Sequence, residues 1–139
     1  MATQPIGFYA YMSVDEDHPG KHHILVFDTV KTNVGNGYNR YSGMFTAPLS
    51  GLYALACSIT MDGTNAYASY DIMKNGDIEG TFFVDAEHGM DLFSGSTTVV
   101  VSLQVGDVLF LRTSSTREPH GNIYSRYYAR SSVSGWRIQ

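Results

Sequence analysis

One segment near the C-terminal end groups side chains that could bind a sugar. Residues 117–124 read Arg-Glu-Pro-His-Gly-Asn-Ile-Tyr. Sugar recognition needs planar polar groups for the hydroxyls and an aromatic face for the ring. The sequence therefore predicts ligand contacts at Arg117, Glu118, His120, Asn122 and Tyr124. An ordinary solvated loop is the competing interpretation.

The same part of the chain is its most basic segment, with Arg112, Arg117, Arg126 and Arg130. Two interpretations follow. Some of these arginines neutralise neighbouring Asp and Glu side chains, or they recognise an anionic ligand such as sialic acid or a lipopolysaccharide phosphate. On the second interpretation Arg126 joins the predicted ligand contacts.

A metal site is the alternative chemistry near the N-terminus. His18, His22 and His23 follow an Asp-Glu-Asp run at 15–17, and imidazole with carboxylate suits zinc. Adjacent residues on a strand point to opposite faces, which works against shared ligation by His22 and His23. A solvated loop is the favoured interpretation, and we predict no metal ligand.

Motifs for catalysis do not occur in the sequence. It contains no Gly-x-Ser-x-Gly, His-Glu-x-x-His, Cys-x-x-Cys or phosphate-binding glycine loop. Scattered Ser, His and Asp residues do not make a triad, which is recognised by geometry. We predict a protein that is not an enzyme and has no catalytic residues.

The composition indicates one domain, which we place at residues 3–139. With 139 residues and 43% hydrophobic content, the chain can bury a core. Its net charge of −4 and the lack of a basic stripe argue against a nucleic-acid partner. No apolar stretch is long enough for a transmembrane helix, so membrane insertion is not expected.

Cys57 is the only cysteine, which excludes an intrachain disulfide. It lies in an apolar run, so a buried core side chain is favoured over a reactive or intersubunit thiol. Residues 1–7 have neither a basic n-region nor an apolar h-region, and no signal peptide is visible. A signal peptide was either replaced by an initiator Met or is absent from the native product.

Short strands separated by turns are predicted along the whole chain, without helices. Many Tyr and Thr favour strands, and fourteen Gly supply turns. The spacing is typical of a sandwich or jelly roll. Residues 33–39 and 62–63 are predicted turns, 117–126 a loop, and 85–96 is ambiguous. The predicted strands are 6–14, 23–30, 41–45, 52–61, 67–73, 78–84, 97–105, 108–111 and 133–138.

A series of landmarks resembles the globular head domain of complement component 1q, the C1q family. The first block comprises Phe27, Asn33, Tyr38, Phe45, Gly51 and Tyr53, with Leu55 and Cys57 where the family prefers aromatic residues. Three further blocks follow in the family's order: Met-Lys-Asn-Gly at 73–76, the apolar run 99–107 ending in Gly-Asp, and the closing segment 133–138.

This resemblance implies an all-β, ten-stranded, tumour-necrosis-factor-like jelly roll that assembles as a homotrimer. An excess of aromatic residues over the needs of one small core also favours subunit contacts. The resemblance places Lys74 and Asn75 at the same end of the jelly roll as residues 117–126, so both join the predicted site. Some relatives bind calcium through acidic residues after a Leu-Tyr pair.

At the matching positions this chain has Ser125 and Arg126, and a cation cannot ligate calcium. The family's acidic cluster is therefore not matched, and no cofactor is predicted. The resemblance implies a secreted lectin of innate immunity, similar to stemless members found in bivalve molluscs, that binds microbial or acidic glycans. The alternative is a trimeric protein ligand of cytokine or synaptic-organiser type.

Overall fold

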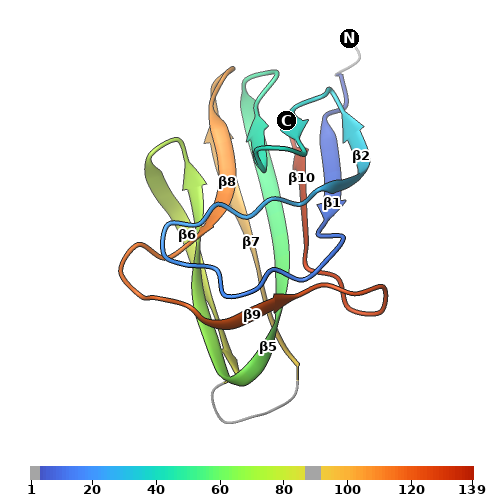
Figure 1. The fold of residues 1–139 in the computed structure, drawn as a ribbon. Coiled ribbons are helices and arrows are strands. Elements are labelled where there is room, and N and C mark those ends of the chain that lie inside the picture. The colour runs from blue at the N-terminus through green and yellow to red at the C-terminus, as the bar shows by residue number, and fades with distance from the viewer. Residues whose placement is uncertain (1–3, 87–91) are drawn as a thin grey trace.

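The computed structural model describes residues 4–86 and 92–139, which form ten strands and no helix. Figure 1 shows the strands stacked in layers, with the segment of residues 12–28 crossing over them. In chain order, the strands are β1 (Gly7–Tyr11), β2 (Thr29–Val34), β3 (Tyr38–Asn39), β4 (Met44–Thr46), β5 (Gly51–Lys74), β6 (Asp77–Ala86), β7 (Phe93–Leu103), β8 (Val108–Thr113), β9 (His120–Tyr124) and β10 (Ser132–Arg137).

The long strand β5 joins the two layers of the jelly roll. Its first half pairs with β10 and β7, and β10 continues through β1 to β2. Its second half pairs with β6 and β8, and β8 continues through β4 to β3. The expected all-β jelly roll is therefore confirmed. The predicted turn at residues 62–63 is a bend within β5, because the strand's hydrogen-bonded pairing continues on both sides of it.

Aromatic residues fill the space between the layers, as the landmark residues predict. Phe8 stacks on Tyr38 with 4.9 Å between ring centroids and on Phe45 at 4.8 Å. Tyr53 is 1% exposed and lies 5.6 Å from Phe45. Its hydroxyl donates to the Leu49 carbonyl at 2.7 Å. Burial of Tyr53 confirms the predicted register of the strand that enters from Gly51.

The buried-core interpretation of Cys57 is also correct. The residue is 4% exposed and faces the interior of the sandwich. Burial raises the pKa of its thiol to about 12, because the thiolate loses its hydration in an apolar site. The thiol therefore stays protonated at neutral pH and is a weak nucleophile.

Besides the turn at residues 62–63, three further predictions of secondary structure were wrong. Residues 23–28 bond to β8 only at scattered points, such as the Leu25 amide to the Leu111 carbonyl at 3.0 Å, so the strand begins at Thr29 instead. The predicted strand 41–45 starts at Met44, after a turn. The predicted loop 117–126 contains β9. The ambiguous stretch 85–96 lies partly outside the described residues.

Candidate functional site

Strand β9 places the predicted site across the bend of β5. Its register sets Ile123 opposite Met61 and His120 opposite Tyr67. Gly121 adopts a φ of 93°, and a Cβ there would lie 2.6 Å from the Ala66 side chain. Only glycine permits both this backbone conformation and this close approach. Residues 120–124 are thus fixed by the sheet and are not a free loop.

Arg117 lies in a group of stacked rings, which we call the Arg117 stack: Tyr67, Phe83, Arg117 and His120. The guanidinium carbon is 4.8 Å from the centroid of the Tyr67 ring and 5.1 Å from that of Phe83. The His120 ring stacks on Tyr67 at 4.6 Å. Stacking engages the flat face of a guanidinium and leaves its in-plane N–H donors for a carboxylate or phosphate. Arg117 is exposed, so these donors can reach a ligand.

A hollow of about 570 Å³ adjoins the Arg117 stack and shares His120 with it. Glu118 and Asn122 line the hollow, together with residues 18–20 and 63–64. The Asn122 side-chain oxygen accepts a hydrogen bond from the His18 backbone amide at 3.0 Å. This bond fixes the orientation of the Asn122 side chain. The structure therefore brings Arg117, Glu118, His120 and Asn122 together, as the sequence predicts.

Other arginines of this segment already have acceptors. Arg126 donates to the Asp15 carboxylate at 2.7 Å and lies 4.8 Å from the Tyr124 ring centroid. This bond holds the pKa of Asp15 below its ordinary value. Arg112 contacts the His22 ring at 3.5 Å between Nη1 and Nδ1 and forms an ion pair with Asp71 at 3.7 Å, and Arg130 donates to two backbone carbonyls. Within residues 4–86 and 92–139, Arg117 alone of the four has no hydrogen-bond acceptor. Charge neutralisation is the correct interpretation for Arg126.

Three further predicted contacts do not reach this site. Tyr124 is 6% exposed and its hydroxyl bonds to that of Tyr128, so it supports the core. Asn75 holds the β5–β6 hairpin, since its side-chain amide donates to Asp107 at 3.2 Å and accepts from the Val108 amide at 3.0 Å. Lys74 pairs with Leu109, seven positions along β5 from Tyr67, or roughly 23 Å at the rise of a strand. The prediction that Lys74 and Asn75 lie beside residues 117–126 was wrong, because β5 carries them to the opposite end of the jelly roll.

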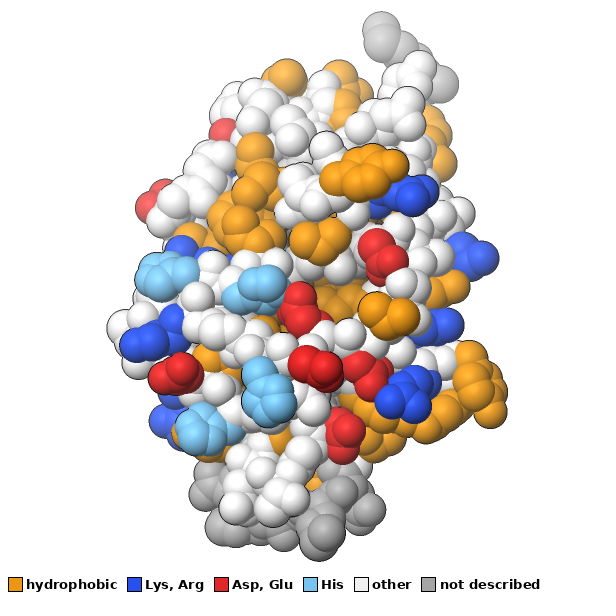
Figure 2. All heavy atoms as spheres, viewed as in Figure 1, with side chains coloured by type: hydrophobic (Ala, Val, Ile, Leu, Met, Phe, Trp, Pro, Cys, Tyr) orange, Lys and Arg blue, Asp and Glu red, His pale blue; other side chains and the backbone are white. Residues whose placement is uncertain are grey.

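The histidine-rich segment near the N-terminus is spread over the surface. Figure 2 shows imidazole and acidic side chains on the same face without a single focus. His23 pairs with Glu16 at 2.7 Å between Nε2 and Oε1. Within the described residues, no three His, Cys, Asp or Glu side chains converge in a geometry that could hold a metal ion.

The outer face of the layer that contains β1, β10 and β7 is shallowly concave and largely uncharged. We call it the small-residue face, because its register places small side chains in adjacent rows, with Ser134, Ala56 and Thr98 in one row. Around them lie four larger, partly exposed side chains: Tyr9, Leu52, Val100 and Trp136. A shallow hollow of about 250 Å³ lies in the centre of this face. Apolar side chains around a concave uncharged surface are typical of a subunit contact.

Comparisons with known proteins agree with this architecture. Residues 7–138 match the sequence profile described as the C1q domain. The chain belongs to the C1q domain family. This C1q chain is 30% identical over 128 residues to mouse complement C1q tumor necrosis factor-related protein 2, covering 91% of the chain and 42% of that relative. The human protein of the same name is also 30% identical, and the match covers 91% of this chain and 43% of that relative. The C1q chain thus spans less than half the length of these curated relatives.

Solved structures show the same fold at low sequence identity. The globular domain of zebrafish complement 1qA protein matches with a TM-score of 0.69 and 12% identity, over 96% of this chain and 98% of that one. The tumour necrosis factor Eiger from S. frugiperda matches with a TM-score of 0.66 and 16% identity, over 99% of this chain and 94% of that one. These likenesses confirm the tumour-necrosis-factor-like jelly roll of the C1q domain. Within the described residues, no helix is long and apolar enough to cross a membrane.

Proposed function

We propose that the chain is a secreted, trimeric recognition protein of innate immunity that binds acidic carbohydrates of microbial surfaces at the Arg117 stack. The observation behind this proposal is the exposed guanidinium of Arg117, which is oriented by two aromatic rings and has no hydrogen-bond acceptor among the described residues. A carboxylate or phosphate on a sugar accepts two parallel bonds from such a group. His120, Glu118 and Asn122 supply further donors and acceptors for hydroxyls beside it.

The trimer is proposed from the small-residue face and the family fold. A concave face of small residues bounded by larger ones is not complementary to itself, so it suits a different patch of a second subunit. Head-to-tail contacts close into a ring when the rotation between subunits divides a full turn evenly, and the family fold supports a ring of three subunits. Three equal weak sites on one particle raise the apparent affinity for a repetitive surface by roughly 10²–10⁴.

A glycan array with matched variants tests the sugar site. Hydrogen bonds to charged groups contribute about 1.5–3 kcal/mol, so Arg117→Ala should weaken binding to sialylated or uronate glycans about tenfold to a hundredfold. Arg117→Lys should retain part of the affinity, because it keeps the charge but loses the planar fork. Arg126→Gln is the control, since Arg126 is occupied by Asp15. Chelation should leave binding unchanged, because the proposed contacts involve no calcium.

A trimeric protein ligand of cytokine or synaptic-organiser type is the second candidate. The 30% identity over 128 residues to the C1q tumor necrosis factor-related proteins supports it. Two results together would select this candidate: no binding on the glycan array, and saturable binding to cells that is lost when the cell surface is treated with protease. Equal binding of Arg117→Ala and the parent protein to acidic glycans would place the sugar site elsewhere.

A further inference from the structure

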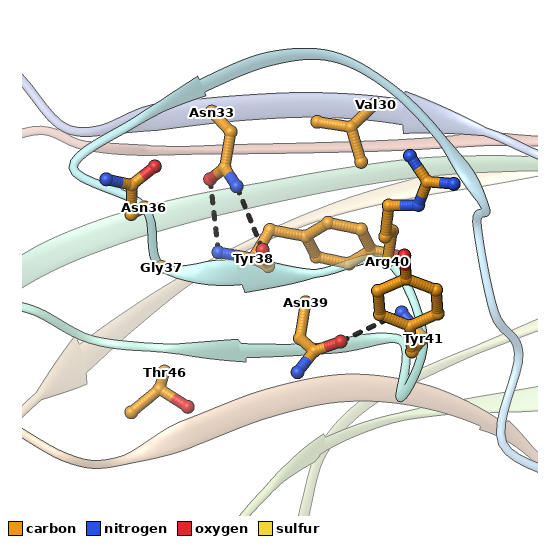
Figure 3. A pocket seen from close by; sticks show the side chains of 9 residues that line it. All are labelled: Val30, Asn33, Asn36, Gly37, Tyr38, Asn39, Arg40, Tyr41 and Thr46. Atoms are coloured by element: carbon orange, nitrogen blue, oxygen red, sulfur yellow. Dashed lines mark hydrogen bonds between the residues drawn. The ribbon is translucent and has the colours of Figure 1, made fainter.

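A second hollow lies between β2 and β3 and has a volume of about 460 Å³. Figure 3 shows it in close view, with Asn36, Asn39, Arg40, Tyr41 and Thr46 around the opening. A hollow of this size accommodates one or two sugar rings. It shares no residue with the Arg117 stack or with the hollow beside β9.

The floor of this hollow is rigid because its polar groups are paired. The Asn33 side chain donates to the Tyr38 carbonyl at 2.9 Å and accepts from the Tyr38 amide at 3.1 Å, as dashed lines mark in Figure 3. The Tyr38 hydroxyl accepts from the Phe27 amide at 3.0 Å and donates to the Phe27 carbonyl at 2.9 Å. Asn33 and Tyr38 therefore build the floor, and a ligand need not order it.

The groups around the opening have spare hydrogen-bonding capacity. The Asn39 side-chain oxygen accepts from the Tyr41 amide at 2.8 Å, which leaves its NH₂ group. Within residues 4–86 and 92–139, the side chains of Asn36, Arg40 and Thr46 make no hydrogen bond. Amides and hydroxyls both donate and accept, as the paired hydroxyls of a sugar require. Tyr41 is 80% exposed and presents an aromatic ring next to them.

The lining of this hollow is mostly uncharged, which suits a neutral ligand. Among the described residues that line it, none is a carboxylate and Arg40 is the only charged one. Arg40 lies 5.1 Å from the Tyr41 ring centroid, so its guanidinium stands over the ring at the edge of the hollow. An anion would meet one cationic group here, whereas the amide and hydroxyl groups around the opening match the several hydroxyls of a neutral sugar.

We propose that the hollow formed by Asn36, Asn39, Arg40, Tyr41 and Thr46 is a binding site for a neutral hexopyranose, recognised through vicinal hydroxyls and a stacked tyrosine. The site is separate from the acidic-glycan site and does not depend on it. With both sites present, one subunit would bind a neutral sugar and an acidic sugar of the same microbial surface independently.

Saturation-transfer NMR with methyl α-mannopyranoside and methyl β-galactopyranoside, each at about 10 mM, tests the site at the weak affinity expected of a single sugar. At least one of the two should receive saturation from the wild-type protein. Tyr41→Ala and Asn36→Gly should each weaken binding about tenfold. Glycine is chosen because Asn36 has a φ of 56°, which alanine would adopt only with strain. The matched control is Tyr127→Ala, which removes a tyrosine that is 87% exposed at a different place.

Each result decides the proposal. Arg117→Ala should leave the neutral-sugar signal unchanged, so failure of the acidic-glycan site and failure of this site are distinguishable. The proposal is overturned if neither hexoside receives saturation, if Tyr41→Ala keeps the full signal, or if Tyr127→Ala removes it. Stronger saturation of N-acetylneuraminic acid than of either hexoside at this hollow would also overturn it, because it would show an anion site.

Discussion

A single charge on the small-residue face should dissociate the proposed trimer. Ser134 lies half-buried on β10 between Tyr9 and Ala56. In an isolated subunit, the carboxylate of Ser134→Glu can reach water. In a trimer that buries this face, it would lose its hydration without a cationic partner.

The magnitude follows from the symmetry of the assembly. An uncompensated buried charge costs about 3–5 kcal/mol. Three equivalent copies at about 3 kcal/mol each give about 9 kcal/mol, which lowers the trimerisation constant roughly 10⁶-fold. Because three subunits associate, the concentration of half dissociation rises with the square root of that factor, about a thousandfold.

Light scattering over a dilution series measures this shift. Wild-type protein should have three times the 15.3 kDa subunit mass, and Ser134→Glu should be a folded monomer at about 1 µM. Ser69→Glu is the matched control, because Ser69 is a half-buried serine on the outer face of the other layer, opposite Phe83 on β6. The reasoning is refuted if Ser134→Glu keeps the trimer mass with an unchanged dissociation midpoint, or if Ser69→Glu dissociates equally.

Three smaller perturbations test the core and the loop contacts. Tyr53→Ala should lower the free energy of unfolding by about 3–5 kcal/mol and Tyr53→Phe by about 1 kcal/mol; equal denaturation midpoints for the two variants would contradict the burial of the ring. Cys57, with a pKa of about 12, should not react with Ellman's reagent at pH 8 until the protein unfolds, and rapid labelling of folded protein would contradict this. The lowered pKa of Asp15 stabilises the fold at pH values above its ordinary 3.8, and this contribution is lost as pH falls through the lower folded value. Arg126→Gln should therefore lose less thermal stability than the parent between pH 5 and about pH 2, and identical acid profiles would show that the pair does not stabilise the fold.

The fold was predictable because its core residues are large and its turns have distinctive sequences. Phe27, Tyr38, Phe45 and Tyr53 are all buried where the landmark spacing places them. The Asn75-Gly76 hairpin is also confirmed, with Asn75 at a φ of 54°. Strand β9 was not predictable by the same means. Its residues include a Gly, a His and an Asn, which weaken the strand pattern. Its pairing partners, the bend of β5 and Glu16 of the N-terminal segment, are both distant in the sequence.

The candidate site was predictable only in part, because a sequence shows which side chains are near in the chain and not which are near in space. Arg117, His120 and Asn122 are close in sequence and meet. Their partners Tyr67 and Phe83 come from two other strands, and no signal in the sequence joins them to Arg117. The second hollow did leave a signal, the run Asn-Arg-Tyr at 39–41 after an Asn-rich turn.

The contrast between Arg117 and Arg126 shows how the fold assigns different roles to identical side chains. Both are exposed, both stack on an aromatic ring, and they stand just before and just after β9. The segment of residues 12–28, which follows β1, brings Asp15 to Arg126, and this carboxylate takes the two donors that a ligand would need. No carboxylate among the described residues reaches Arg117, whose neighbours Tyr67 and Phe83 orient the guanidinium without consuming its donors. The crossing of residues 12–28 near one end of β9 therefore neutralises Arg126 and leaves Arg117 open to the ligand that we propose.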